Sequence, residues 1–148
     1  MSKVTPLPHH SVYVRIGQSK IHGVGLIAIV RIKKDTDLFP NDQSELTWIK
    51  VDNLQKMRPA YRKLYDDFCV RKGDAYGCPH NFNELTVSWY LNHSELPNVR
   101  CDSKYHFFAI RDIQVGEELT VDYRTYSEGF IPGTHTPKSL GQSSEIIR

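Results

Sequence analysis

Long hydrophobic runs and cysteine pairs are what this sequence most clearly lacks. None of its 148 residues belongs to an apolar run near the roughly 18 residues that a membrane helix needs. Only three cysteines occur, with no C-x-x-C pair, and an odd count argues against a disulfide framework. Cys78 and His80 alone are too few ligands for a structural zinc ion. We therefore expect neither a metal site nor a membrane span.

A strong excess of charge is also missing. Nineteen lysines and arginines oppose 17 aspartates and glutamates, and the net charge of +2 does not by itself indicate nucleic acid. Residues 50–72 carry seven basic and three acidic side chains, whereas residues 92–128 carry four and seven. Two interpretations stay open: an acidic face that attracts a basic peptide, or two solvated surfaces without a partner. Residues 1–10 lack the apolar core of a secretory signal, so we expect an intracellular protein, cytoplasmic or nuclear.

What the sequence does contain is a series of short, strand-like segments in a length that suits one domain. Apolar alternation and short apolar runs predict strands at 11–16, 26–30, 46–51, 99–102, 105–110 and 119–122. Glycines and polar residues predict turns or loops at 17–25, 33–37 and 73–83. Many short strands without alternating βαβ units indicate a mostly β member of the α+β class.

Helical spacing appears in the middle of the chain, within about residues 52–70. Pro59 suits the first turn of a helix. The apolar residues that follow at helical spacing predict one apolar face, made of Tyr61, Leu64, Tyr65 and Phe68.

Three segments carry residues suited to chemistry. His22–Ala28 has two glycines one residue apart, which let a backbone approach a ligand, but a dinucleotide fold would need a helix to follow. Asn92–Asn98 offers amide and imidazole groups that can hydrogen-bond a purine, ribose or carboxylate. Gly116–Tyr123 is a turn and a strand that ends in tyrosine. Glu117 and Glu118 point to opposite faces of that strand, so a structural or surface role is predicted for them. Taken singly, the first segment is better explained as a tight turn, and the second as an Asn/Ser-rich loop with a buried, hydrogen-bonded histidine.

Together and in this order, the three segments resemble the SET-domain family. The family's H-G-x-G-L-x-A opening matches His22–Ala28, N-H-S-x-x-P-N matches Asn92–Asn98, and G-E-E-L-T-x-D-Y matches Gly116–Tyr123. The resemblance implies an α+β, mostly β fold of several short sheets, with a knot-like C-terminal crossing and one helical insert. It covers about residues 11–126, which leaves residues 1–10 as an irregular lead-in and 127–148 as a C-terminal tail.

The resemblance also implies an activity, the transfer of methyl from S-adenosylmethionine to a lysine of a histone or non-histone protein. Tyr123 is the implied catalytic residue, and Tyr126 acts beside it as a wall of the lysine channel. Val121 stands where relatives often carry Phe or Tyr, and its smaller side chain leaves room for di- or trimethylation. The implied cofactor-binding residues are His22, Gly23, Val24, Gly25, Trp89, Tyr90, Asn92 and His93.

The sequence departs from the family pattern in several places. It has no cysteine-rich segments that bind zinc on either side, Trp89 replaces a common arginine, and residues 35–42 lack a tyrosine that many relatives place in the active site. The channel would then be closed by Phe130 or Ile131 of the tail, or by a second chain in a homodimer.

These departures keep an alternative open, a catalytically silent SET module that binds a peptide or partner protein. A nucleic-acid-associated protein that uses residues 50–72 is disfavoured, because that segment also holds acidic residues and an apolar helix face.

Overall fold

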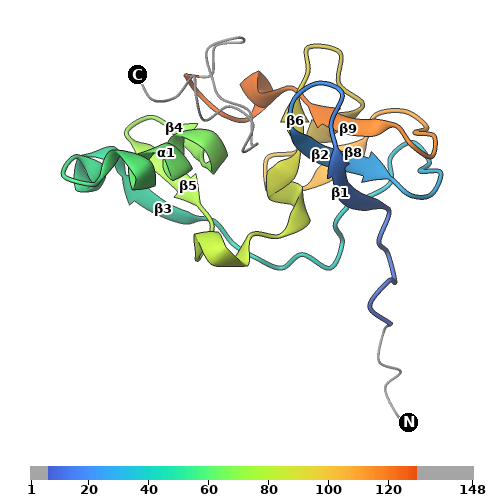
Figure 1. Ribbon diagram of the computed structural model, residues 1–148, viewed down its shortest axis with the longest axis horizontal. Coiled ribbons are helices and arrows are strands. Elements are labelled where there is room, and N and C mark those ends of the chain that lie inside the picture. Colours follow the sequence, from blue (N-terminus) through green and yellow to red (C-terminus); the bar gives the residue numbers. More distant parts are fainter. Residues whose placement is uncertain (1–6, 130–148) are drawn as a thin grey trace.

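The computed structural model describes residues 7–129 as short strands and helical turns (Figure 1). The strands are β1 (Val14–Gln18), β2 (Val24–Ala28), β3 (Thr47–Lys50), β4 (Val70–Lys72), β5 (Ala75–Cys78), β6 (Asn92–His93), β7 (Val99–Cys101), β8 (Phe107–Ala109) and β9 (Glu118–Val121). The helical elements are the 3₁₀ turns η1 (Val51–Leu54), η2 (Phe82–Glu84), η3 (Val87–Tyr90) and η4 (Tyr123–Thr125), and the α-helix α1 (Pro59–Phe68). The expected mostly β, α+β class is confirmed.

The first lobe is a six-stranded sheet in the order β1-β2-β9-β7-β8, with β6 also paired to β9. β9 runs antiparallel to β2 and parallel to both β6 and β7. Its apolar side chains, with those of the neighbouring strands, make the main core, in which Leu26, Leu119 and Val121 are completely buried. The last of the strands described within residues 7–129 is therefore the central one.

Asn98 fastens the C-terminal crossing. β9 pairs with the strands on both sides of the 94–98 loop, so β9 lies across the two ends of that loop. The Asn98 side chain donates to the Glu118 carbonyl at 2.9 Å and accepts from Thr120 N at 2.8 Å. Its side-chain amide thus adds to the hydrogen bond from Asn98 N to the Thr120 carbonyl, at 3.2 Å, which fits the knot-like crossing that the resemblance implied.

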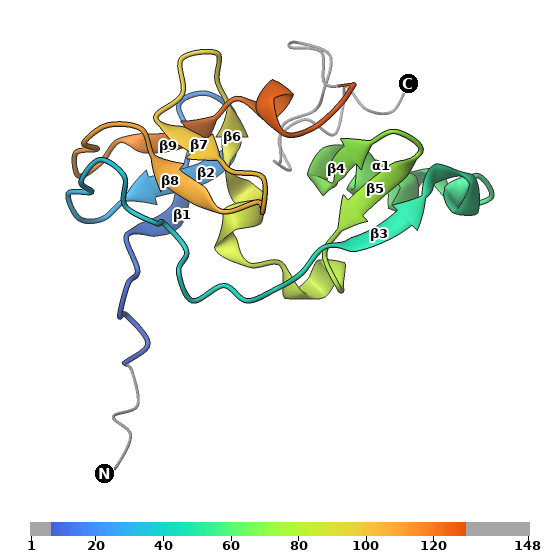
Figure 2. The ribbon, with the colours of Figure 1, turned by 180° about the vertical axis from the view of Figure 1, so that it is seen from behind.

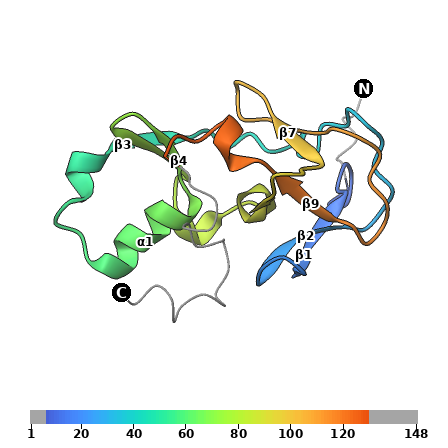
Figure 3. The ribbon, with the colours of Figure 1, turned by 90° about the horizontal axis from the view of Figure 1, so that it is seen from above.

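The second lobe packs α1 against a three-stranded sheet in the order β3-β5-β4 (Figures 1 and 3). The prediction of loop throughout residues 73–83 was wrong, because β5 is paired on both sides. Gly77 is a packing residue in this strand: a Cβ there would lie 3.0 Å from Trp48 and 3.1 Å from Leu46. Only Gly73, with a φ of 54°, makes the expected turn.

The apolar face of α1 is only partly buried. Pro59 occupies the first turn as predicted, but Tyr61 is 55% exposed, and no residue of the helix is fully buried. Tyr65 contacts Phe82 at 5.1 Å between ring centroids, and Phe68 contacts Tyr90 at 5.7 Å. The C-terminal half of the helix thus packs against the rest of the protein, while Tyr61 faces solvent.

Two segments of the chain connect the lobes: residues 39–46, and the segment that contains η2 and η3 (Figure 2). A third connection follows η4, where Ser127 Oγ accepts from Arg71 N at 2.9 Å and Glu128 N donates to Arg71 O at 2.8 Å. The predicted tail thus begins against β4. Its remainder, 130–148, lies outside the described residues, as does most of the lead-in.

Replacing Asn98 with alanine should destabilise the fold by about 2–5 kcal/mol, because the buried Thr120 N–H and the Glu118 carbonyl would each lose a partner. Chemical denaturation followed by circular dichroism measures the change in the free energy of unfolding. Asn53→Ala, on the exposed surface of η1, is the matched control and should shift stability by no more than about 0.5 kcal/mol. Equal stabilities of the two variants would contradict this role for Asn98.

Candidate active site

A hydrogen-bonded turn joins β1 to β2. Ser19 Oγ accepts from the backbone N–H groups of Ile21 and His22, each at 2.9 Å, and Ser19 N donates to the Gly23 carbonyl at 2.8 Å. Gly23 has a φ of 55°, a conformation that glycine adopts without strain. The turn fixes His22, whose Nε2 is buried and has no hydrogen-bond partner among the described residues.

The second glycine of this segment serves a different purpose. Gly25 is buried in β2 with ordinary strand pairing, but a Cβ there would lie 2.3 Å from Glu118 Oε2 and 2.9 Å from Asn92 Nδ2. Any larger residue would displace these two polar side chains or push β2 away from them. Gly23 therefore shapes the turn, and Gly25 permits a close approach.

Asn92 is the buried polar residue that meets this turn. Its side chain, on β6, is 1% exposed and donates from Nδ2 to Val24 O and to Glu118 Oε2, both at 2.9 Å. Its Oδ1 is buried and has no partner among the described residues. An unsatisfied buried polar atom costs about 1–3 kcal/mol unless a water or a ligand pairs with it, which makes Asn92 Oδ1 a candidate ligand-binding atom. Asn92 Oδ1 and His22 Nε2 are two such atoms, and both lie at the His22–Gly25 segment, which we call the glycine cradle.

His93, the next residue of β6, holds the end of β9. Its Nδ1 accepts a hydrogen bond from Tyr123 N at 3.1 Å, which leaves the ring hydrogen on Nε2. Burial lowers the pKa of His93 below its ordinary value of 6.5, although the nearby carboxylate of Asp122 opposes this shift. The imidazole is therefore neutral at neutral pH.

Two buried tyrosines follow β9. Tyr123 and Tyr126 are each 9% exposed, and their ring centroids lie 6.1 Å apart. The Tyr123 hydroxyl donates a short hydrogen bond to the Leu91 carbonyl. Burial raises the pKa of both phenols, and the charge of Glu118 adds to the shift of Tyr123. Both rings consequently carry neutral hydroxyl groups.

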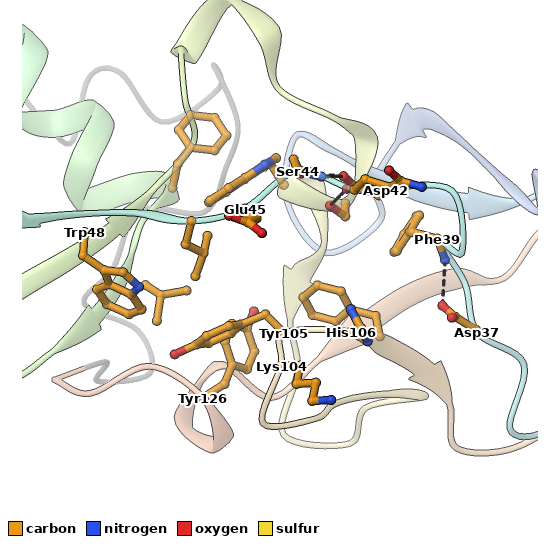
Figure 4. A pocket seen from close by; sticks show the side chains of 17 residues that line it. Asp37, Phe39, Asp42, Ser44, Glu45, Trp48, Lys104, Tyr105, His106 and Tyr126 are labelled. Carbon is orange, nitrogen blue, oxygen red and sulfur yellow. Dashed lines mark hydrogen bonds between the residues drawn. The ribbon is translucent and has the colours of Figure 1, made fainter.

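A cavity of about 420 Å³ opens beside Tyr126, between the 37–48 segment and the turn after β7 (Figure 4). Aromatic rings, among them Trp48, Tyr105 and Tyr126, form much of its wall. Its carboxylates are Asp37, Asp42 and Glu45, and its basic side chains are Lys104 and His106.

Ring contacts link this cavity to the cluster around Asn92. Tyr126 lines the cavity and contacts Tyr123, and the Tyr123 ring lies 5.3 Å from the His93 ring. His93 in turn neighbours Asn92 on β6. A row of contacting rings therefore runs from the cavity to the cluster around Asn92.

A sequence model of the SET domain matches residues 23–124 of this chain. The chain belongs to the SET-domain family. The fold agrees with this: the crystal structure of a Plasmodium falciparum protein proposed to be a histone methyltransferase is similar, with a TM-score of 0.54 and 21% sequence identity. The match covers 76% of this chain and 93% of that one. A search of functionally curated proteins found no match.

The SET fold brings most of the predicted site residues together. His22, Asn92 and His93 lie around the glycine cradle, with Tyr123 and Tyr126 behind them. Trp89 instead lines the cavity, and Tyr90 packs against Phe68, another cavity residue.

Val121 was predicted to line the lysine channel. It is completely buried in the main core and paired with Val99, and it does not line the cavity beside Tyr126. The predicted tail residues Phe130 and Ile131 lie outside the part of the chain that the structure describes.

Sequence reasoning missed several residues of this site. Glu118 accepts hydrogen bonds from Asn92 Nδ2 and from Ser19 Oγ. Tyr105, in the turn after β7, lines the cavity. The polar Ser19 before the glycine pair was an available signal, because a serine can cap a turn. For Tyr105 the sequence carried no comparable signal, since its place depends on how the two lobes meet.

Within residues 7–129, no three histidine, cysteine or acidic side chains are grouped so that they could hold a metal ion. The same residues include no helix of the length and apolar character required to cross a membrane.

Acidification should weaken the fold through His93. Its pKa is depressed in the folded protein, so below its ordinary value of 6.5 the unfolded chain takes up a proton first. The free energy of unfolding should therefore fall as the pH drops from 6.5 toward the lower folded-state pKa. Denaturation of the wild type and of His93→Gln from about pH 7.5 to about pH 5.5 measures this contribution.

The difference in unfolding free energy between the two proteins should shrink over that range. His80→Gln, on the exposed surface, is the control and should follow the wild-type profile. A constant difference between wild type and His93→Gln would contradict the assigned protonation state.

Proposed function

We propose that this SET domain transfers a methyl group from S-adenosylmethionine to the side-chain amine of a lysine in a protein substrate. One arrangement supports this above all. Asn92 Oδ1 and His22 Nε2, two buried polar atoms without partners among the described residues, lie at the glycine cradle. The aromatic cavity lies beside Tyr126, and the buried rings of Tyr123 and Tyr126 lie between the cavity and the cradle. A transfer reaction needs two such compartments that meet at one point.

The residues around the cradle fit the cofactor. The backbone of His22–Gly25 lies close to Asn92, because Gly25 has no side chain to separate β2 from it. Asn92 Oδ1 offers a buried acceptor, and His93 completes the wall from the same strand. Trp89 and Tyr90, on η3, are proposed to contact it as in other members of the family; η3 packs beside β1 and β2.

The protein's part in the reaction is to position the amine and to exclude water. When bound, the cofactor supplies a methyl group on a positively charged sulfur. The lysine must be neutral to attack, although its ordinary pKa is about 10.4. Burial among aromatic rings disfavours the ammonium form, and Tyr123 and Tyr126 provide such surroundings.

Tyr123 acts here as a hydrogen-bonding group. Its raised pKa keeps the phenol protonated, so it does not serve as a general base at neutral pH. Its hydrogen is donated to the Leu91 carbonyl, and a phenol oxygen can also accept a hydrogen bond, which we assign to the lysine amine. The hydroxyl therefore orients the amine.

The cavity beside Tyr126 is the proposed entrance for the substrate lysine. The carboxylates of Asp37, Asp42 and Glu45 favour a positively charged segment on approach, and a histone tail or a basic segment of another protein would fit.

Calorimetric titration of the purified protein with S-adenosylmethionine tests the cofactor site. The wild type should show saturable binding, and Asn92→Ala should lower the affinity by at least about 10-fold, because it removes the buried acceptor. Asn53→Ala is the matched control and should bind as the wild type does. Equal affinities in all three folded proteins would exclude the proposed site.

Removing the Tyr123 hydroxyl should abolish most turnover while the fold persists. We expect Tyr123→Phe to reduce kcat by about 100-fold or more, as for the loss of one oriented group at a reacting centre. The stability should fall by only about 1 kcal/mol, because the Leu91 carbonyl loses one hydrogen bond. Transfer of labelled methyl to core histones and to a library of lysine peptides measures the rate.

Tyr61→Phe removes an exposed hydroxyl and serves as the control for this test. Undiminished turnover of Tyr123→Phe would contradict its catalytic role. A wild type that binds the cofactor and a peptide but transfers no methyl group would favour the alternative, a silent SET module that binds a partner.

A further inference from the structure

Glu118 occupies an unusual place for a carboxylate. It is half-buried at the start of β9, and no salt bridge within residues 7–129 involves it. Its Oε1 accepts from Ser19 Oγ at 2.6 Å, and its Oε2 accepts from Asn92 Nδ2 at 2.9 Å. Its neighbour Glu117 points elsewhere and accepts from Arg111 and from Gln114 N at the surface. The two adjacent glutamates therefore have separate roles.

A carboxylate is suited to fixing the orientation of Asn92. An asparagine amide can be rotated by half a turn, which exchanges its donor and acceptor ends. A carboxylate accepts only, so Glu118 Oε2 binds the Nδ2 end and repels the Oδ1 end. Val24 O imposes the same orientation from β2. As a result, the buried Oδ1 is kept as the end without a protein partner.

The other oxygen of Glu118 orients the turn before β2. Ser19 Oγ already accepts from the backbone N–H groups of Ile21 and His22, so its own hydrogen is directed to Glu118 Oε1. The same turn carries His22, whose Nε2 is the second buried atom without a partner at this site. One carboxylate thus holds both sides of the cradle.

We infer that Glu118 is a positioning residue for the cofactor, acting through Asn92 and Ser19. This inference rests on the proposed function, because it names what the buried acceptor is oriented for. Glu118 belongs to the protein's support of the cofactor and does not touch the substrate lysine.

Glutamine cannot replace Glu118 in this network. If the glutamine oxygen faces Asn92, the glutamine NH₂ group faces Ser19 Oγ, which already accepts two hydrogen bonds. The hydroxyl hydrogen of Ser19 would then have no acceptor. If its amine faces Asn92, two donors meet and the Asn92 amide must rotate. Glu118→Gln should therefore weaken cofactor binding by about 10- to 100-fold, the value of a hydrogen bond to a charged group.

The test measures two properties of the wild type, Glu118→Gln, Ser19→Ala and the matched control Glu117→Gln. The first is the nuclear magnetic resonance signal of the Asn92 side-chain amide in the free protein, which reports the Glu118–Asn92 hydrogen bond without any ligand. The second is the calorimetric affinity for S-adenosylmethionine and for S-adenosylhomocysteine. Circular dichroism verifies the fold of each variant, and Ser19→Ala carries the test if Glu118→Gln does not fold.

The inference requires that the Asn92 signal shifts in Glu118→Gln and Ser19→Ala but not in Glu117→Gln. Affinity for both ligands should fall together, because an oriented Asn92 serves groups that the two ligands share. An unchanged Asn92 signal, or unchanged affinities, would overturn the inference. A loss confined to S-adenosylmethionine would also overturn it, because it would indicate direct attraction of the sulfonium charge. A wild type that binds neither ligand would refute the proposed cofactor site itself, whatever the Asn92 signal shows about the Glu118–Asn92 bond.

Discussion

The hydrogen bonds of β9 hold the candidate active site in register. This strand lies between β2 on one side and β6 and β7 on the other, so the glycine segment, the Asn-His pair and the closing tyrosines are all placed relative to it. Glu118 at its start reaches Asn92, Thr120 in its middle binds Asn98, and Tyr123 follows its end. Segments about a hundred residues apart in sequence become neighbours because one late strand is inserted between two earlier parts of the sheet.

The site combines a costly feature with well-satisfied surroundings. Asn92 and His22 each bury one polar atom that has no partner among the described residues. Such atoms lower stability unless a water, an ion or a ligand satisfies them. Around them, by contrast, Ser19, Glu118 and the turn backbone satisfy one another. This contrast between a satisfied framework and unsatisfied buried atoms is what distinguishes a binding site from loose packing.

The two lobes make different contributions. The sheet lobe holds the cradle, whereas the cavity beside Tyr126 is lined from both lobes, with Phe68 and Val70 from one and Phe107 from the other. Residues just after Tyr126 bind β4, which ties the end of the SET core to the insert. The insert is therefore part of the proposed substrate entrance as well as an addition to the fold.

Sequence reasoning performed best where a residue's chemistry is needed for a local reason. Gly23 needs a left-handed backbone, and Asn92, His93 and Tyr123 stand in segments whose order resembles the SET domain. It failed at Gly77, which looked like a loop residue but packs in a strand, because the decisive neighbour Trp48 is distant in sequence. The sequence also predicted the same structural or surface role for Glu117 and Glu118. Alternation along a strand shows that they point to opposite faces, but it does not show which residues each of them contacts.

The sequence by itself determined the family, the mostly β class and the three segments that meet at the site, because these follow from motif order and from periodicity along the chain. Only the tertiary structure decided which of the two glutamates supports Asn92, where Trp89 and Val121 lie, and which residues wall the cavity. Those features depend on β9 entering between β2 and β6, and on the contact between two lobes. Such long-range packing leaves no periodic signal in the residues that take part in it.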